Sequence, residues 1–401
     1  MGLPSVGRGA LIPSEKQPTR GFRDFEFSLR ELAGSMGDFG TLFPLAIGYI
    51  AVNGLNPAGL FMMLGLTNIA LGLIYRLPMP LQPKKVVAAV AISQAWSPTL
   101  IYASGFGLGL TWLLLTFSGL LQKLVDVTPT YLVRGIQLGL GLTLGWQALR
   151  MMQSAPLLGV LAVAVVLLLR ENRYAPASIV LMALGVGIIG WRGELGGLKI
   201  VLTLPPLTPP HLADAWKAMV LAGFAQIPLT LGNAVMATAA VIRETFPEKA
   251  VSERKLMLNM GVINVVSSLF GGMPMCHGAG GFASQVYFGA RTGGAPIMEG
   301  LIEVGIGLFL SQSIADVMAA FPMALVGGML LLVGVQLSVA SCRLRGWPLV
   351  VALVTGGVSV LTNIGIGFLV GLALSHLVRA LRRRGLLPRL CPAQDDPVQD
   401  C

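Results

Sequence analysis

Long apolar stretches separated by short polar turns dominate the sequence from residue 30 to residue 381. A helix needs about 20 consecutive apolar residues to cross a bilayer, and many of these stretches approach or exceed that length. The pattern predicts an all-α polytopic membrane protein with fourteen transmembrane segments. The expected segments are 30–51, 57–75, 83–97, 99–121, 130–149, 155–170 and 175–191, then 214–241, 255–271, 278–290, 296–312, 321–340, 346–361 and 363–381.

Two of these segments, the third and the tenth, are interrupted by proline and are too short to cross a bilayer. The first interruption, 77–85, holds three prolines and two lysines, and the second, 273–281, holds one proline and a run of small residues. Proline disrupts a helix interior but fits the first helical position. Each interruption therefore predicts a stretch of extended chain followed by a half-helix. The unpaired N–H groups at the start of this half-helix would lie inside the protein.

The two interruptions occupy matching places in a duplicated chain. Residues 65–79 align without gaps on 261–275 at an offset of 196 (261 − 65), and 129–141 align on 322–334 at an offset of 193 (322 − 129). Such self-similarity indicates an internal duplication. Seven segments per copy is an odd number, so the second copy must insert upside down. We therefore expect two inverted repeats related by a pseudo-two-fold axis in the membrane plane.

Composition and charge agree with a membrane location. Hydrophobic residues make up 54% and charged residues 11% of the 401 residues, against the roughly 25% charge of a soluble protein. The net charge of +10 collects at segment ends, which is typical of cytoplasmic loops and argues against a nucleic-acid partner. The expected organisation is a cytoplasmic tail (1–29), a first repeat (30–191), a linker (192–213), a second repeat (214–384) and a short cytoplasmic tail without a regulatory domain (385–401).

The sequence offers no residues for enzymatic chemistry. It has no nucleophile–base–acid set and no phosphate-binding loop, and its four cysteines lack the spacing of a zinc site or a disulfide framework. We expect no catalytic residue, no metal and no cofactor.

The half-helix ends are the main candidates for a binding site. Each end carries roughly half a positive charge, and one lysine raises the total to about +2, which balances a divalent oxyanion. Gln82, Pro83, Lys84 and Lys85 are the candidates in the first interruption, because a charge at intramembrane depth is costly and usually functional. Structural alternatives stay open: prolines that only kink packed helices, a lysine that snorkels or pairs with a carboxylate, and a capping role for Gln82.

The first segment of each repeat adds polar candidates inside apolar helices. Asp38, flanked by Ser35 and Phe39, could pair with a site lysine, carry a proton, or make a structural hydrogen bond. Gln226 and Asn233, in the matching segment of the second repeat, could line the cavity or hydrogen-bond between helices.

The second interruption contributes His277, Gly278, Ala279 and Gly280, whose small neighbouring side chains leave backbone N–H groups open to a ligand. A lone histidine is more often structural. Glu299 and Glu303 share one helix face further on, where they could face the cavity or bind Arg134 or Arg291, and the structural role is favoured.

Three stretches resemble the signature motifs of the molybdate transporter family, a branch related to the sulfate permeases. They are ELAGSMGDFGT (31–41), PMPLQPKK (78–85) and PMCHGAGG (274–281), and the resemblance extends over about 30–380. The family's lysine falls on Lys85, whereas Lys84 stands where many members have an apolar residue such as Met. This departure favours Lys85 as the site lysine.

The resemblance implies the seven-plus-seven inverted-repeat fold of the uracil and sulfate permeases. In that fold a core domain (segments 1–4 and 8–11) moves against a gate domain (5–7 and 12–14), and a homodimer through the gate domain follows only by analogy. The implied function is import of molybdate across the plasma or inner membrane by alternating access, with both termini cytoplasmic. Sulfate or tungstate as substrate, a passive anion channel, and a receptor that binds without transport stay open as alternatives.

Overall fold

The computed structural model describes residues 24–120, 129–169, 177–194, 197, 199–339, 341–342 and 344–383. The expected C-terminal tail and most of the N-terminal tail lie outside these residues. Regular structure in the first half is helical apart from one short strand. Its helices are α1 (Leu29–Ser35), η1 (Met36–Asp38), α2 (Phe39–Ala51), α3 (Pro57–Tyr75), α4 (Lys85–Ser93), α5 (Pro98–Ser118), α7 (Thr130–Met152), α8 (Pro156–Leu168) and α9 (Ala177–Trp191).

The second half is built in the same way. Its helices are α10 (Leu212–Ala218), η2 (Met219–Gly223), α11 (Phe224–Thr230), η3 (Leu231–Ala237), α12 (Thr238–Thr245), η4 (Pro247–Lys249), α13 (Glu253–Leu269), α14 (Ala279–Phe288), α15 (Gly294–Gly305), η5 (Ile306–Leu310), α16 (Ser311–Ala320), α17 (Met323–Val339), α18 (Trp347–Leu361) and α19 (Ile364–Arg383). These bounds fall within a few residues of the expected segments, except that α16 continues the helix begun by α15 and η5 well beyond 312.

Local sequence explains where the helices start. Asn56 precedes α3, and its side-chain oxygen accepts from the N–H groups of Ala58 and Gly59 at 2.9 and 3.3 Å. Pro57 follows at the first helical position, where its missing N–H costs nothing. Ser97 and Pro98 repeat this arrangement at the start of α5.

Among the described residues, five helices are long and apolar enough to cross a membrane. They are Pro57–Tyr75, Pro98–Ser118, Leu212–Thr245, Gly294–Ala320 and Ile364–Arg382. The helices α4 and α14 have only 9 and 10 residues, which is half of a membrane crossing. The interruptions in the sequence therefore produce half-helices, while the total of fourteen crossings stays a prediction.

Two short strands join the interrupted segments. Strand β1 (Gln82–Pro83) pairs antiparallel with β2 (Met275–Cys276), so that Gln82 lies opposite Cys276 and Pro83 opposite Met275. The N–H of Lys84 extends the ladder by donating to the carbonyl of Pro274 at 2.8 Å. This β1–β2 ribbon fixes the starts of α4 and α14 next to one another, although they are far apart in the sequence.

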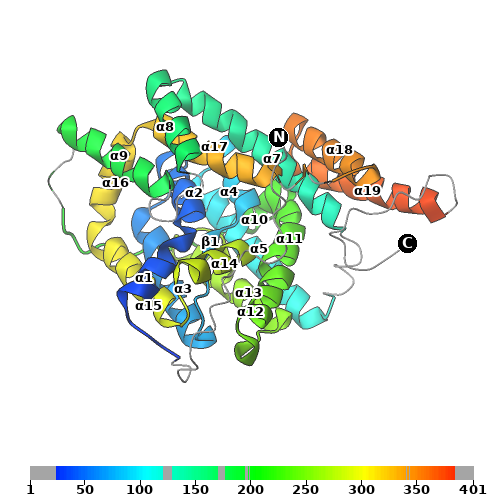
Figure 1. The fold of residues 1–401 in the computed structure, drawn as a ribbon, viewed down its shortest axis with the longest axis horizontal. Coiled ribbons are helices and arrows are strands. Elements are labelled where there is room, and N and C mark those ends of the chain that lie inside the picture. Colours follow the sequence, from blue (N-terminus) through cyan, green and yellow to red (C-terminus); the bar gives the residue numbers. More distant parts are fainter. Residues whose placement is uncertain are drawn as a thin grey trace.

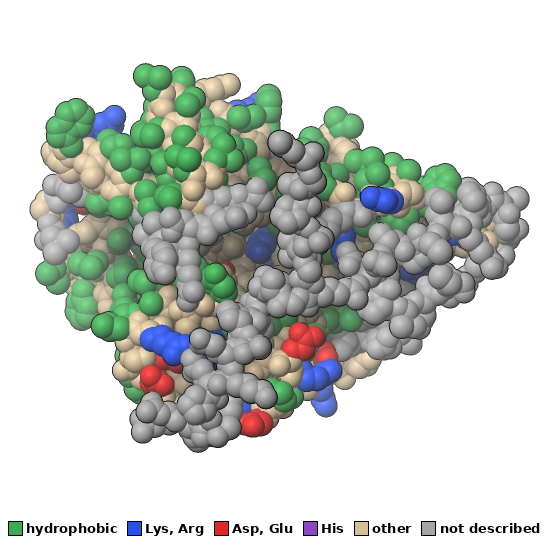
Figure 2. Space-filling model, viewed as in Figure 1, with side chains coloured by type: hydrophobic (Ala, Val, Ile, Leu, Met, Phe, Trp, Pro, Cys, Tyr) green, Lys and Arg blue, Asp and Glu red, His purple; other side chains and the backbone are tan. Residues whose placement is uncertain are grey.

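The ribbon lies in the middle of the molecule, between two groups of helices (Figure 1). In that view α7, α17, α18 and α19 cross the upper part, and α3, α13 and α15 occupy the lower part. The most extensive helix pairings are α17 with α7, α15 with α3, α13 with α5, and α18 with α7. Charged side chains gather along the lower edge of this face and apolar ones cover its upper and left parts (Figure 2).

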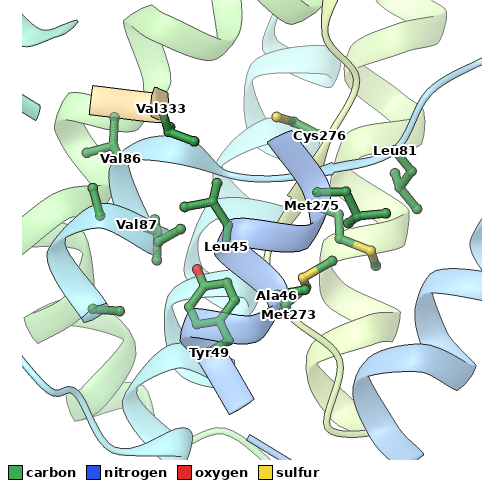
Figure 3. Packing of buried hydrophobic residues seen from close by; sticks show 14 of the residues in the cluster. Leu45, Ala46, Tyr49, Leu81, Val86, Val87, Met273, Met275, Cys276 and Val333 are labelled. Carbon is green, nitrogen blue, oxygen red and sulfur yellow. The ribbon is translucent and has the colours of Figure 1, made fainter. Parts of the chain in front are cut away.

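Glycine permits α3 and α15 to pack closely. A Cβ on Gly65 of α3 would clash with the carbonyl of Gly300 on α15, and the reverse clash holds for Gly300. Close backbone approach through small residues is the usual way that helices pack in membranes. Around the ribbon, Leu45, Ala46 and Tyr49 of α2 pack beside Met273 and Met275 (Figure 3).

Candidate functional site

The candidate site is formed by the N-terminal ends of α4 and α14. Neither helix has a side-chain N-cap, and intrahelical bonding begins only where Ala88 N–H donates to the Lys84 carbonyl and Phe282 N–H to the Gly278 carbonyl. The N–H groups of each first turn therefore have no partner within their own helix. Two positive dipole ends meet here, which is the usual setting for an anion.

Gln226 of α11 reaches one of these donors. Its Oε1 accepts from the backbone N–H of Val86 at 2.8 Å, and its Nε2 donates to the Thr230 hydroxyl at 2.8 Å. Gln226 is therefore a side chain that holds the start of α4 in place. Thr230, which fixes the orientation of that amide, was not among the residues expected from the sequence.

Asp38 and Gln82 meet at the start of α14. Gln82 Nε2 donates to Asp38 Oδ1 at 2.8 Å, and both side chains are buried. A Cβ on Gly281 would collide with both Gln82 Nε2 and Asp38 Oδ2, and one on Gly278 would press against the Gln82 amide at 3.0 Å. The glycines are therefore needed for this pair to lie against the first turn of α14.

Gly280 differs from its neighbours because it faces open space. It is exposed, and a Cβ built on it meets nothing within 4 Å. In the space-filling view, a recess near the middle of the face shows both basic and acidic side chains in its depth (Figure 2). The first turn of α14 is therefore accessible at Gly280, although the helix start around it is packed.

The two lysines have different surroundings. Lys84 is fully buried, its Nζ has no hydrogen-bond partner among the described residues, and it lies 6.0 Å from the centre of the Trp112 ring. Lys85 is half-buried at the first position of α4, and its charge acts on the carboxylate of Asp38. The accessible lysine is thus the one that the family motif favours.

The remaining expected residues make contacts that support the site. The Ser35 hydroxyl donates to the Leu32 carbonyl at 2.8 Å, and the Phe39 ring packs on Phe43 with centroids 4.3 Å apart. His277 is fully buried, with Nδ1 3.3 Å from the Pro80 carbonyl oxygen.

Three further expected residues complete the surroundings. Pro83 is part of the ribbon, and Ala279 begins α14. Asn233 lies half-buried in η3, where its carbonyl accepts from the Thr238 hydroxyl at 3.0 Å.

Two contacts beside the site could not be read from the sequence. Asn264 of α13 donates to the Met275 carbonyl at 2.8 Å and accepts from the Met275 N–H at 2.9 Å, which holds β2 in place. Asn68 of α3 donates to Glu303 at 2.8 Å. The available signal was that Asn68 and Asn264 occupy equivalent positions in the two repeats, as polar residues within apolar helices.

Sequence comparison gives a consistent result over most of the chain. A family model described as "Molybdate transporter of MFS superfamily" matches residues 30–144 and 218–337. Molybdate transporter 1 of Arabidopsis thaliana is 30% identical over 413 residues, which covers 90% of each chain. Molybdate transporter 2 of the same plant is 30% identical over 367 residues, covering 78% of each chain.

Structural comparison identifies the fold. The transmembrane domain of a cyanobacterial bicarbonate transporter, BicA, superposes with a TM-score of 0.65 at 16% sequence identity. The match covers 85% of this chain and 97% of that domain. The fold is therefore that of a helical membrane transporter.

Proposed function

The chain belongs to the molybdate transporter family, and from that premise we propose that it imports molybdate by alternating access, holding the anion between the starts of α4 and α14. The observation that carries this proposal is the β1–β2 ribbon, which sets two half-helix N-termini beside each other, neither of them capped by the side chain of its own N-cap residue. Membership of the family also makes the protein a transporter and not an enzyme.

The desolvation of the anion supports this position. A dianion that leaves water must be met by several donors, because its burial otherwise costs far more than binding returns. Backbone N–H groups at two helix starts are already oriented and lose little entropy on binding. Lys85 adds a full positive charge at the same place, and Gly280 leaves room for the ion to approach.

The packing of the helices supports two inverted repeats. By the sequence offset of 196, α13 and α15 are the counterparts of α3 and α5. Helix α3 packs on α15 and α5 packs on α13, so the pattern is unchanged when the repeats are exchanged. The antiparallel β1–β2 ribbon is also unchanged when the repeats are exchanged, as a two-fold axis between them requires. We place α1–α5 and α10–α16 in a core domain and α7–α9 and α17–α19 in a gate domain.

Counterflow in proteoliposomes tests the transport proposal. Vesicles loaded with unlabelled molybdate should accumulate labelled molybdate from outside, with saturable kinetics. A channel would give flux without stimulation by internal molybdate, and a receptor would bind the ion without flux. Competition by sulfate and by tungstate in the same assay separates the substrates, and stronger inhibition by sulfate than by unlabelled molybdate would contradict molybdate as the preferred ion.

A further inference from the structure

The half-helix α14 holds the first helical segment of the chain through two side chains. Gly281, Ser284 and Gln285 are spaced three and four positions apart, so they share one face of α14. The Ser284 hydroxyl donates to the Gly37 carbonyl at 2.9 Å, and Gln285 Nε2 donates to the Ser35 carbonyl at 3.1 Å. Both bonds join residues that are about 250 positions apart in the sequence, one in each half of the chain.

The two carbonyls lie where α1 passes through η1 into α2. The N–H of Phe39 donates to the Met36 carbonyl, three residues back, so the chain is wound more tightly here than in an α-helix. Hydrogen bonds in such a turn have poorer geometry, and partners from outside can stabilise it. Gln285 is only 1% exposed. The backbone of Gly37 approaches α14 closely, because a Cβ there would lie 2.9 Å from the Ser284 carbonyl oxygen.

The turn η1 ends at Asp38, so its conformation sets the direction of this side chain. Asp38 Oδ1 accepts from Gln82 Nε2 at 2.8 Å. The Gln82 amide in turn lies against the first turn of α14, where a Cβ on Gly278 would be 3.0 Å from Nε2. An amide nitrogen carries two hydrogens. Because Asp38 takes one of them, the direction of the second is fixed as well.

The other half-helix does not have these side chains. At the repeat offset of 196, the positions in α4 that match Ser284 and Gln285 are Ala88 and Ala89, whose side chains cannot donate. The start of α4 is held instead by Gln226, which accepts from the Val86 N–H. Polar side chains at these positions are therefore not a general need of a half-helix, which indicates a task specific to α14.

We propose that Ser284 and Gln285 are positioning residues for the oxyanion: they hold η1 so that Asp38 orients the Gln82 amide, whose second N–H donates to the ion at the first turn of α14. The proposal rests on the transport function above. A donor that is already oriented loses less entropy on binding than one that rotates freely. Anion affinity therefore depends on two side chains that lie one helical turn beyond the ion.

The experiment measures binding of labelled molybdate to the purified protein and the maximal rate of counterflow in proteoliposomes. Ser284→Ala should weaken binding by roughly 3- to 10-fold at an unchanged maximal rate, and Gln285→Met, which keeps the length but not the donor, should act in the same direction. Ser284→Thr keeps the hydroxyl and should bind as wild type does. The matched control is Ser93→Ala at the end of α4, where a half-buried hydroxyl donates to the Val90 carbonyl of its own helix at 3.1 Å.

A double-mutant cycle tests whether the effect passes through Gln82. Gln82→Met alone should weaken binding by roughly tenfold or more. Adding Ser284→Ala to it should cause no further loss, because the amide that Ser284 positions is already absent. Residues that act independently would instead give losses that multiply.

The outcomes separate this inference from the function on which it rests. Wild-type affinity in folded Ser284→Ala and Gln285→Met would overturn the positioning role, and so would multiplying losses in the cycle or a Ser284→Thr variant as weak as Ser284→Ala. Wild-type vesicles without counterflow would overturn molybdate transport, while the binding measurements would still decide the positioning role. Thermal unfolding shows whether each variant is folded, and the Ser284 pair decides the matter if Gln285→Met is not.

Discussion

At the scale of single residues, the structure shows different surroundings for neighbouring side chains that the sequence alone could not distinguish. Lys84 and Lys85 are adjacent in a motif, yet one is sealed beside Trp112 and the other is half-buried at the start of α4. The prolines made both interruptions predictable. The bonds from Gln82 to Asp38 and from Val86 to Gln226 were not, because each depends on how distant segments meet.

Replacing the two lysines should have different effects. Lys85→Ala removes a charge-assisted contact to the anion, worth about 1.5–3 kcal/mol, and should weaken apparent molybdate affinity by roughly 10- to 100-fold. Lys84→Met removes a buried ammonium without a hydrogen-bond partner while keeping similar volume, so uptake should persist and the protein should become no less heat-stable. Uptake kinetics and thermal unfolding of purified protein measure both. Normal affinity in Lys85→Ala would remove Lys85 from the site.

A side chain at Gly280 should obstruct the anion without disturbing the fold. Gly280→Val adds bulk where a Cβ meets nothing within 4 Å, so we expect molybdate affinity to fall by roughly tenfold or more at unchanged thermal stability. Gly357→Val in α18 is the matched control, because a Cβ there also meets nothing within 4 Å. Gly327, in the proposed gate domain, is unsuitable, since its Cβ would lie 2.7 Å from the Ala148 carbonyl oxygen. Equal affinities in the two variants would count against an anion at α14.

At the scale of elements, the helices were largely predictable and their contacts were not. Apolar length and the Asn-Pro and Ser-Pro starts place both ends of α3 and the start of α5 within a residue of their expected positions. The register of β1 with β2 carries no local signal, because four residues cannot specify a partner nearly two hundred positions away. The hydrogen bond from Asn68 of α3 to Glu303 of α15 escaped prediction for the same reason.

The segment before α1 is anchored by Asp24. Its carboxylate accepts from Arg76 at 2.7 Å and lies 3.1 Å from the Lys249 ammonium, while its carbonyl accepts from Gly293 at 3.2 Å. The hydrogen bond from Lys249 lowers the pKa of Asp24, and the charges of Lys249 and Arg76 act in the same direction. With its pKa lowered on folding, Asp24 supports the anchor above the ordinary pKa of about 3.9 and loses that support as the pH falls through the folded value.

Asp24→Asn should therefore loosen this anchor at neutral pH. We expect faster hydrogen exchange in peptides covering 24–28 and 291–295, with little change in global stability because the Asp24 carboxylate and Arg76 are exposed. Glu248→Gln, which alters an exposed carboxylate in η4, should leave both peptides unchanged. Equal exchange in wild type and Asp24→Asn would show that the backbone bonds alone hold the segment.

At the scale of the whole molecule, the sequence predicted a membrane transporter, and the comparisons agree. The direction of insertion rests on the positive charges alone. Arg76, Lys249 and Lys255 lie together, since the ammonium groups of both lysines bond to carbonyls at the end of α3. The positive-inside rule therefore predicts that this end faces the cytoplasm.

Thiol labelling in a variant without its four cysteines tests the orientation. Glu248→Cys should react with an impermeant reagent only from the cytoplasmic face, and Arg192→Cys, after α9, only from outside. Both positions are exposed, so access to the reagent depends on the side of the membrane. Labelling of both residues from the same side would refute the odd number of crossings between them.

The β1–β2 ribbon has a consequence for ancestry. One strand comes from each half of the chain, and so does one half-helix of the site. Under the proposed inverted duplication, a single-copy ancestor could not build the site alone. It had to associate with a second copy of itself inserted in the opposite direction, so the ancestral gene product was of dual topology before fusion gave each half a separate sequence history.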